Sequence, residues 1–312
     1  LLWTEDTALL SAPPSISDNR LVVSRTSGHY GNALVGIYSQ DDELLWSYHI
    51  WCPQESPDNL LLYNKTYTQS REVMPMALGA MKSATASDSD SDKLDACGLY
   101  YQWGRKDPMG RPSGFNSSTL KTIYDASGNA IDQTSESLNK EDMEETLWEN
   151  LGNNAFDYGL VERVSCDFAV ANPMVFINNE NDMWDYTWHG NPESSLWEDW
   201  HKTVFDPCPA GYRIAPRDLY VNFDKNNRQG SFSNGSAWYY QNQGSGPVDF
   251  YPAQGTRIVG GTVTYGFYKA VYWNAARTCP LEFNSNRVSA IPDVSKNYDY
   301  GNPAAPLRCV RD

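Results

Sequence analysis

The sequence predicts a fold of short strands joined by long irregular loops rather than a helical bundle. Glycine (22), proline (18), tyrosine (20) and tryptophan (11) are abundant among the 312 residues, and this mixture favours short strands and turns over helical bundles. The apolar runs are short, and no long amphipathic helix is visible. With 40% hydrophobic and 20% charged residues, the chain has enough apolar material for a core and too little net charge for disorder. We expect one domain over residues 1–312.

The first strands are predicted near the N-terminus, where two apolar runs surround an acidic turn. After a short β-rich run at Leu21–Ser24, the segments Asn32–Tyr38 and Glu43–Trp51 flank the pair Asp41-Asp42, which predicts a β-hairpin. Both faces of the second strand carry aromatic side chains, so we expect it to be buried on both sides. Its alternating residues are Trp46, Tyr48 and Ile50 on one face, and Leu45, Ser47, His49 and Trp51 on the other.

Three polar segments are predicted to be loop insertions, at residues 83–95, 125–145 and 182–201. The first contains a Ser/Asp/Ala run, Ala84–Asp92, that is typical of a mobile loop tip. The second ends in an acidic stretch that predicts a short helix before Trp148. The third is dense in tryptophan and is expected to be an ordered loop, and short strands resume after Pro207.

The chain is acidic, with a formal net charge of −15. This charge disfavours nucleic acid, because phosphates are held by Lys and Arg, and it disfavours anionic membrane surfaces. No apolar run approaches the roughly 18 residues needed to cross a bilayer, so we do not expect a membrane-spanning protein. The start at Leu1 lacks the basic region of a signal peptide. We therefore expect the C-terminal part of a longer protein.

The six cysteines form no C-x-x-C pair, so zinc ribbons and thioredoxin-like sites are unsupported. Their wide spacing suits either the disulfides of an exported protein or isolated buried thiols. If all six pair, about 15 connectivities remain open. The cysteines are Cys52, Cys97, Cys166, Cys208, Cys279 and Cys309.

Three blocks of sequence match a known pattern. The first comprises Gly31–Val35 and Leu45–Trp51. The second is Gly98–Pro108, which reads GLYYQWGRKDP. The third comprises Asp206–Ile214 (DPCPAGYRI), Val271–Asn274 and Pro306–Asp312 (PLRCVRD). Together they resemble the C-terminal domain of fimbrillin-like cell-adhesion proteins of Bacteroidetes, which is related to the Fibrobacter succinogenes major paralogous domain.

The resemblance covers the chain from about Asn32 to Asp312. It departs from the family at Val73–Ala80, where the family usually has Asp-Arg-Asn in the middle. It implies a C-type-lectin-like fold, shared with formylglycine-generating enzymes, which is a mixed α+β domain with long irregular loops on small twisted antiparallel sheets. In such a fold the termini lie side by side and the N-terminal strand pairs near the C-terminal one. It also implies a disulfide between Cys208 and Cys309, and leaves the other four cysteines unassigned. An exported protein at the cell surface, in fimbriae associated with the outer membrane, is the localisation that it suggests.

A cluster of aromatic residues in the third loop is the main candidate for ligand contact. Exposed aromatic rings stack on sugars or anchor protein partners, whereas buried ones fill a loop-rich core. We favour core packing and keep the cluster as a candidate contact surface. Its members are Trp184, Tyr186, Trp188 and Trp197, with His189 and Trp200 nearby.

Metal binding is not expected. In sugar-binding C-type lectins a Trp-Asn-Asp strand supplies a calcium ligand, but the matching segment here is Trp273-Asn274-Ala275, and no Glu-Pro-Asn or Gln-Pro-Asp occurs. The run Asp88–Asp92 resembles the start of an EF-hand, yet the sixth position would be Lys93 and the twelfth Leu99. A solvated acidic loop explains that run better.

Catalytic motifs are also lacking, and we assign no catalytic residue and no cofactor. The four histidines show no metal-ligand spacing, and His49 within a predicted strand suits a hydrogen-bonded core histidine better than a base. The tail Arg308-Cys309-Val310 resembles that of formylglycine-generating enzymes, whose chemistry needs two nearby cysteines. Here Cys279 and Cys309 lie far apart in sequence, and the fold analogy alone is a weak argument.

These observations lead to the hypothesis of a non-enzymatic adhesion protein, either a fimbrial tip or a pilus-associated subunit. Its partners would be other pilus subunits and a glycan or protein on a host or microbial surface, recognised through the three loops. A purely structural pilus component is the closest alternative. A calcium-independent carbohydrate-binding module is a further one.

Overall fold

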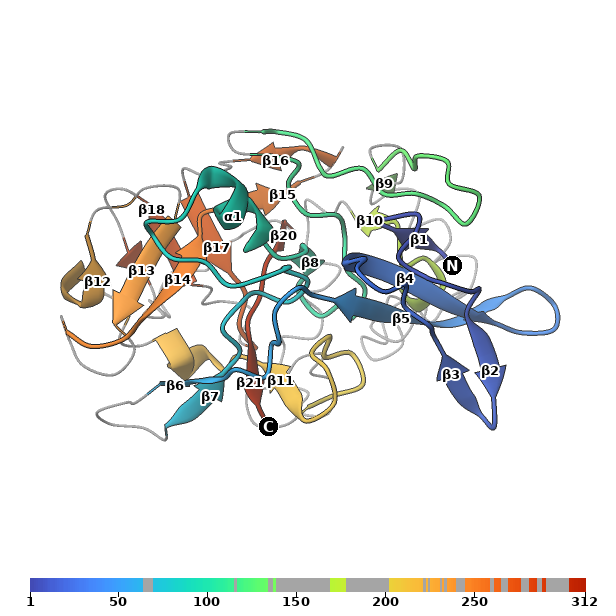
Figure 1. Ribbon diagram of the computed structural model, residues 1–312, viewed down its shortest axis with the longest axis horizontal. Coiled ribbons are helices and arrows are strands. Elements are labelled where there is room, and N and C mark those ends of the chain that lie inside the picture. Colours follow the sequence, from blue (N-terminus) through green and yellow to red (C-terminus); the bar gives the residue numbers. More distant parts are fainter. Residues whose placement is uncertain are drawn as a thin grey trace, which may run out of the picture.

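Small antiparallel sheets with few helices make up the described part of the protein, as the computed structural model shows (Figure 1). This agrees with the sheet-and-loop architecture expected from the composition. The structure describes residues 1–63, 70–114, 117–133, 137–138, 169–177, 202–220, 223, 225–230, 232, 235–239, 245–258, 261–264, 269–275, 281–284, 288–289 and 303–312.

Two sheets contain the chain ends and the segments that matter most for function. The first is antiparallel, in the order β1 (Trp3–Thr4), β4 (Gly31–Tyr38), β5 (Leu44–Cys52). The second is antiparallel, in the order β11 (Tyr212–Ile214), β21 (Cys309–Arg311), β7 (Arg71–Val73), β6 (Leu61–Tyr63).

Five smaller sheets complete the described architecture. Three of them are antiparallel and have three or four strands. One has the order β12 (Arg228–Gln229), β13 (Gly235–Tyr239), β14 (Val248–Pro252), and another has the order β17 (Lys269–Tyr272), β18 (Leu281–Asn284), β19 (Val288–Ser289). The third has the order β16 (Val263–Thr264), β15 (Thr256–Arg257), β20 (Ala304–Ala305), β8 (Tyr101–Gln102). The others are the hairpin β2 (Ser15–Ser17) with β3 (Arg20–Val22), and the parallel pair β9 (Ser137–Leu138) with β10 (Phe176–Ile177). The described helical elements include α1 (Asp90–Asp95), η3 (Arg217–Tyr220) and η4 (Lys225–Asn227).

The predicted hairpin is confirmed as β4 and β5, which pair from Gly31 opposite Cys52 to Tyr38 opposite Leu44. Asp42 in the connecting turn has φ +60°, a left-handed conformation that Asp tolerates better than most residues. The expectation that β5 is buried on both sides is wrong, because Leu45 and Tyr48 are 53% and 47% exposed.

The N-terminal strand does not pair near the C-terminal one, contrary to the expectation from the resemblance. β1 pairs with β4, whereas β21 lies between β11 and β7 in another sheet. In Figure 1 the N-terminus lies near β4, and the C-terminus lies at the end of β21.

The prediction of a loop at residues 83–95 is wrong for its second half, because Asp90–Asp95 form the helix α1. Ser89 caps this helix, since its hydroxyl accepts a hydrogen bond from the Asp92 amide. Lys93 is buried and its ammonium lies 6.0 Å from the Phe250 ring centroid. The helix therefore packs against the body of the protein.

Two apolar clusters form most of the described core. One surrounds the cysteine bridge and includes Trp3, Leu34, Leu99, Trp273 and Leu307. The other is rich in aromatic residues, whose rings meet mainly edge to face, as for Trp238 with Tyr251 at 5.6 Å and with Phe283 at 4.5 Å. The segment Val73–Ala80 joins both clusters, because Met74 and Leu78 pack in the first and Ala77 in the second.

Candidate functional site

A groove of about 800 Å³ runs beside β5. One wall is β5 from Trp46 to Trp51, and the other is the segment Val204–Tyr212, which leads into β11. Met74, Leu78 and Cys208 also line the groove, and all three are buried, so they lie at its base. A volume of this size falls in the range of ligand-binding sites.

Aromatic side chains line the groove on both walls. The Trp46 ring lies 4.3 Å from the Lys106 ammonium and 6.3 Å from the Phe205 ring centroid, so contacts with the opposite wall hold it in place. Tyr48 is 47% exposed. The Tyr212 hydroxyl donates to Asp58 Oδ1 at 2.6 Å, at a rim of the groove that also contains Pro57.

Lys106 contributes a buried charge to the groove. Its ammonium donates to the Ser47 carbonyl at 3.1 Å, to Ser47 Oγ, and to the two Asp107 carboxylate oxygens at 2.7 and 2.9 Å. Ser47 Oγ in turn donates to Asp107 Oδ1 at 2.6 Å. Burial lowers the pKa of Lys106 and raises that of Asp107, and their attraction opposes both shifts. The ammonium thus attaches the segment around residue 106 to β5.

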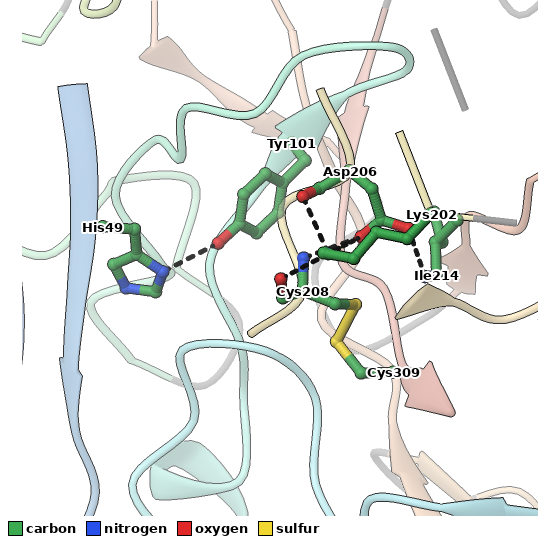
Figure 2. Close-up of a disulfide and its surroundings, with 7 residues drawn as sticks. All are labelled: His49, Tyr101, Lys202, Asp206, Cys208, Ile214 and Cys309. Atoms are coloured by element: carbon green, nitrogen blue, oxygen red, sulfur yellow. Dashed lines mark hydrogen bonds and ion pairs between the residues drawn. A yellow bond between two sulfur atoms is a disulfide. The ribbon is translucent and has the colours of Figure 1, made fainter. Parts of the chain in front are cut away.

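His49 lines the same groove, and its hydrogen-bond partners determine which ring nitrogen carries the proton. Its Nε2 lies 2.9 Å from Asn32 Oδ1. Asn32 Nδ2 donates to Glu5 Oε2 and to the Gly79 carbonyl, both at 2.8 Å. Asn32 Oδ1 can therefore only accept, so Nε2 carries the proton and Nδ1 accepts from the Tyr101 hydroxyl at 3.2 Å. Figure 2 shows Tyr101 pointing toward the imidazole.

This arrangement confirms the hydrogen-bonded core histidine expected from the sequence. Burial lowers the pKa of His49 to about 4, although Glu5 opposes the shift.

Stability should fall as the pH drops through the window set by His49. The unfolded chain takes up the His49 proton near its ordinary pKa of about 6.5, whereas the folded protein takes it up only near 4. The contribution of neutral His49 to the free energy of unfolding is complete above about pH 6.5 and is lost as the pH falls toward 4. Its size is at most about 3 kcal/mol. Urea unfolding across this range should show a shallower pH dependence for His49→Gln than for the parent protein. The same substitution at the partly exposed His29 is the control, and equal slopes for the two variants would contradict the assignment.

The wall opposite β5 is anchored by the disulfide between Cys208 and Cys309, whose Cα atoms lie 5.8 Å apart. This is the bridge that the resemblance implied. Asp206 accepts from the amides of Cys208 and Ile214 at 2.9 and 2.8 Å and from the Lys202 ammonium at 3.0 Å. Figure 2 shows these groups gathered around the bridge. A disulfide is typical of proteins that fold in oxidising compartments, which is consistent with an exported protein.

The residues proposed from sequence as ligand contacts lie outside the described residues. They are Trp184, Tyr186, Trp188 and Trp197, together with the rest of the loop at 182–201 up to His201. Within the loop predicted at 125–145, residues 125–133 and 137–138 are described. The Asp125 carboxylate caps a turn by accepting from the Ser127 and Asn129 amides, both at 2.8 Å, whereas Ser137–Leu138 form the short strand β9 rather than loop. The short helix expected before Trp148 lies outside the described residues too.

Sequence reasoning missed the groove residues Trp46, Tyr48 and Tyr212. A signal was present for the first two, because β5 carries aromatic residues on both faces. Aromatic residues on both faces also occur where one face borders a binding groove, and the sequence did not distinguish this case from full burial.

No group of three or more His, Cys, Asp or Glu side chains converges on a metal site in the described part of the chain. Asn274, in the segment that matches the calcium-binding strand of lectins, is fully buried. Cys309 is bonded to Cys208, which removes it as a partner for Cys279, a residue outside the described ones. Cys52 and Cys97 are free thiols.

No helix in the described residues is long and apolar enough to cross a membrane. Searches with this chain against models of protein families, curated proteins and solved structures found no match.

Proposed function

We propose that this chain is a non-enzymatic adhesion domain at the cell surface, with the C-type-lectin-like fold of the fimbrillin-like proteins that it resembles. It belongs to a fimbrial tip or pilus-associated subunit and recognises a ligand on a host or microbial surface. The observation that carries the proposal is the groove of about 800 Å³, lined by aromatic residues and anchored on one side by a disulfide. Rigid scaffolds that present a concave aromatic surface are suited to recognition.

The polar groups of the groove favour binding over catalysis. Lys106, Asp206 and His49 each form hydrogen bonds with neighbouring residues of the fold. A nucleophile or general base must be able to reach the substrate, and its own pKa must suit the reaction. These three groups position the walls instead.

All three blocks that carry the resemblance meet at this groove. Leu45–Trp51 supplies the β5 wall, Gly98–Pro108 supplies Lys106, and Asp206–Ile214 supplies most of the opposite wall. This convergence supports the view that the shared pattern maintains a recognition site.

The proposal is tested by an array of glycans and host-matrix proteins probed with the purified domain, once with calcium and once with EDTA. We expect binding that survives EDTA, because the groove presents aromatic rings and backbone groups rather than a cluster of carboxylates. Loss of binding in EDTA would indicate a calcium-dependent site and contradict this mode of recognition. Binding to nothing on the array would favour a structural role in the pilus.

Tyr48→Ala should weaken ligand binding about tenfold, because exposed aromatic rings in a groove contribute a large share of binding energy. Tyr38→Ala is a matched control, since Tyr38 lies on the partner strand of the same hairpin and is 48% exposed, against 47% for Tyr48. Both variants should unfold at about the same urea concentration as the parent. An equal loss of binding in the two variants would place the ligand elsewhere.

A further inference from the structure

β5 is an edge strand, and the groove runs along its open edge. Among the described residues, where the sheet order is β1-β4-β5, this strand pairs with β4 alone. Six consecutive residues of β5, Trp46 to Trp51, line the groove. Consecutive residues of a strand point to opposite faces, so a cavity that contacts all of them borders the edge of the strand.

The hydrogen bonds of β4 identify which backbone groups of β5 face this edge. The carbonyls of Asn32 and Leu34 accept from Glu5 and Leu2 on the β1 side, at 2.9 and 2.8 Å. Their neighbours Ala33 and Val35 therefore bond to β5, opposite Ile50 and Tyr48. It follows that the N–H and C=O groups of Ser47, His49 and Trp51 point away from β4. The Lys106 ammonium that reaches the Ser47 carbonyl agrees with this assignment.

Only part of this edge is protected. Lys106 occupies the carbonyl of Ser47, and Pro53 lies just beyond the strand. Within the described residues, no backbone group pairs with the outward N–H and C=O of His49 or Trp51. Natural sheets usually shorten, bulge or cover such an edge, because unpaired donors and acceptors are a template for another strand. β5 has nine residues and contains no proline.

We infer that the groove binds an extended polypeptide segment that adds to the sheet as a strand beside β5. The inference rests on the proposed adhesion function and makes the ligand a protein rather than a glycan. Main-chain bonds to His49 and Trp51 would supply affinity that is independent of the ligand's side chains, and the groove would receive alternate side chains.

The lining of the groove indicates the chemistry of the ligand. Its base is apolar, with Met74 and Leu78, which suits apolar residues at every second position of the ligand. The Asp206 carboxylate is paired with Lys202. The exposed Asp58 carboxylate accepts from the Tyr212 hydroxyl and pairs with no Lys or Arg of the described residues. The chain carries a net charge of −15, which attracts cations over a distance. An extended segment with alternating apolar residues and a flanking Lys or Arg fits these features.

Synthetic peptides about as long as β5, which has nine residues, test the inference. Each peptide alternates threonine with one of valine, isoleucine, tyrosine or phenylalanine and carries lysine at both ends. For the tightest binder, two further versions are N-methylated at the odd or at the even positions. Only one set of amides in an extended peptide faces β5, so one version should lose binding at least about tenfold, and the other should keep it.

Substitutions at the groove rim provide a second readout. Asp58→Asn should weaken the lysine-ended peptide about two- to fivefold, as expected for an exposed ion pair. Val204→Lys should weaken it as well, because Val204 is 67% exposed and lines the groove. The control is Asp41→Asn, which makes the same charge change in the hairpin turn, away from the groove lining.

The possible outcomes separate this inference from the proposed function. Peptide binding that is lost in one N-methylated version and weakened by Asp58→Asn supports strand addition. Failure of every peptide, or equal binding of both N-methylated versions, overturns it. Glycan binding that Tyr48→Ala weakens, without peptide binding, overturns strand addition and leaves the adhesion function standing.

Discussion

Replacing Arg308 by methionine is expected to lower the free energy of unfolding by about 3–5 kcal/mol, because it leaves a buried carboxylate without its counter-ion. Arg308 and Asp249 are 1% and 4% exposed. The guanidinium donates to the two Asp249 carboxylate oxygens at 3.1 and 3.3 Å. It also donates to the carbonyls of Met74 and Phe250, at 2.8 and 2.7 Å.

The surroundings of this pair explain why so little water would be available to the orphaned charge. The guanidinium carbon lies 4.2 Å from the Tyr251 ring centroid, and the Tyr63 hydroxyl donates to Asp249. Burial disfavours the charge on Arg308, but Asp249 and the neighbouring tyrosines outweigh it and raise the pKa of Arg308 above its ordinary value. Arg308 therefore stays charged and links the residue just before β21 to Met74, which follows β7, and to β14.

The measurement is urea unfolding of Arg308→Met beside Arg311→Met. Arg311 lies three residues further along and pairs with Glu72, but its side chain is 52% exposed, so its loss should cost less than about 1 kcal/mol. Adding Asp249→Leu to Arg308→Met should recover part of the stability, because the carboxylate is removed as well. Similar costs for Arg308→Met and Arg311→Met would contradict the role assigned to the buried pair.

The predicted parts of the fold are those with a local signal. The β4–β5 hairpin follows from two apolar runs around Asp41-Asp42, and both strands form where these runs lie. Helix α1 also had a local signal that was missed, since Ser89 and Asp92 have the spacing of an N-cap. The dense Ser/Asp composition of the segment outweighed it in the sequence prediction.

The groove and the buried charges depend on pairings between distant residues, which one sequence does not encode locally. Arg308 meets Asp249 across 59 residues, and Lys106 meets Ser47 across 59. In sequence, each charged residue resembles an ordinary surface residue. The bridge between Cys208 and Cys309 could be anticipated only from the resemblance, because the number of cysteines leaves many pairings open.

Removing the disulfide should be the second change with a large effect. The double substitution of Cys208→Ala and Cys309→Ala is expected to lower the free energy of unfolding by about 2–5 kcal/mol. The two cysteines are separated by 101 residues, and the chain-entropy estimate for a loop of that length is about 4–5 kcal/mol. Urea unfolding of the double variant under non-reducing conditions gives the value.

The position of the bridge adds a consequence for binding. Cys309 begins β21, whose partners are β11 and β7, and Cys208 lines the groove. Without the bond, the part of this wall around Cys208 keeps the hydrogen bonds of Asp206 and Lys202 but loses its covalent link to β21, so ligand affinity should fall at urea concentrations at which the core is still folded. Cys52→Ala is the control, because Cys52 is a partly buried thiol without a bridge. If the double variant were as stable as Cys52→Ala and bound the ligand equally well, the bridge would neither stabilise the fold nor hold the groove wall. The groove would then have to be held by its hydrogen bonds and apolar contacts.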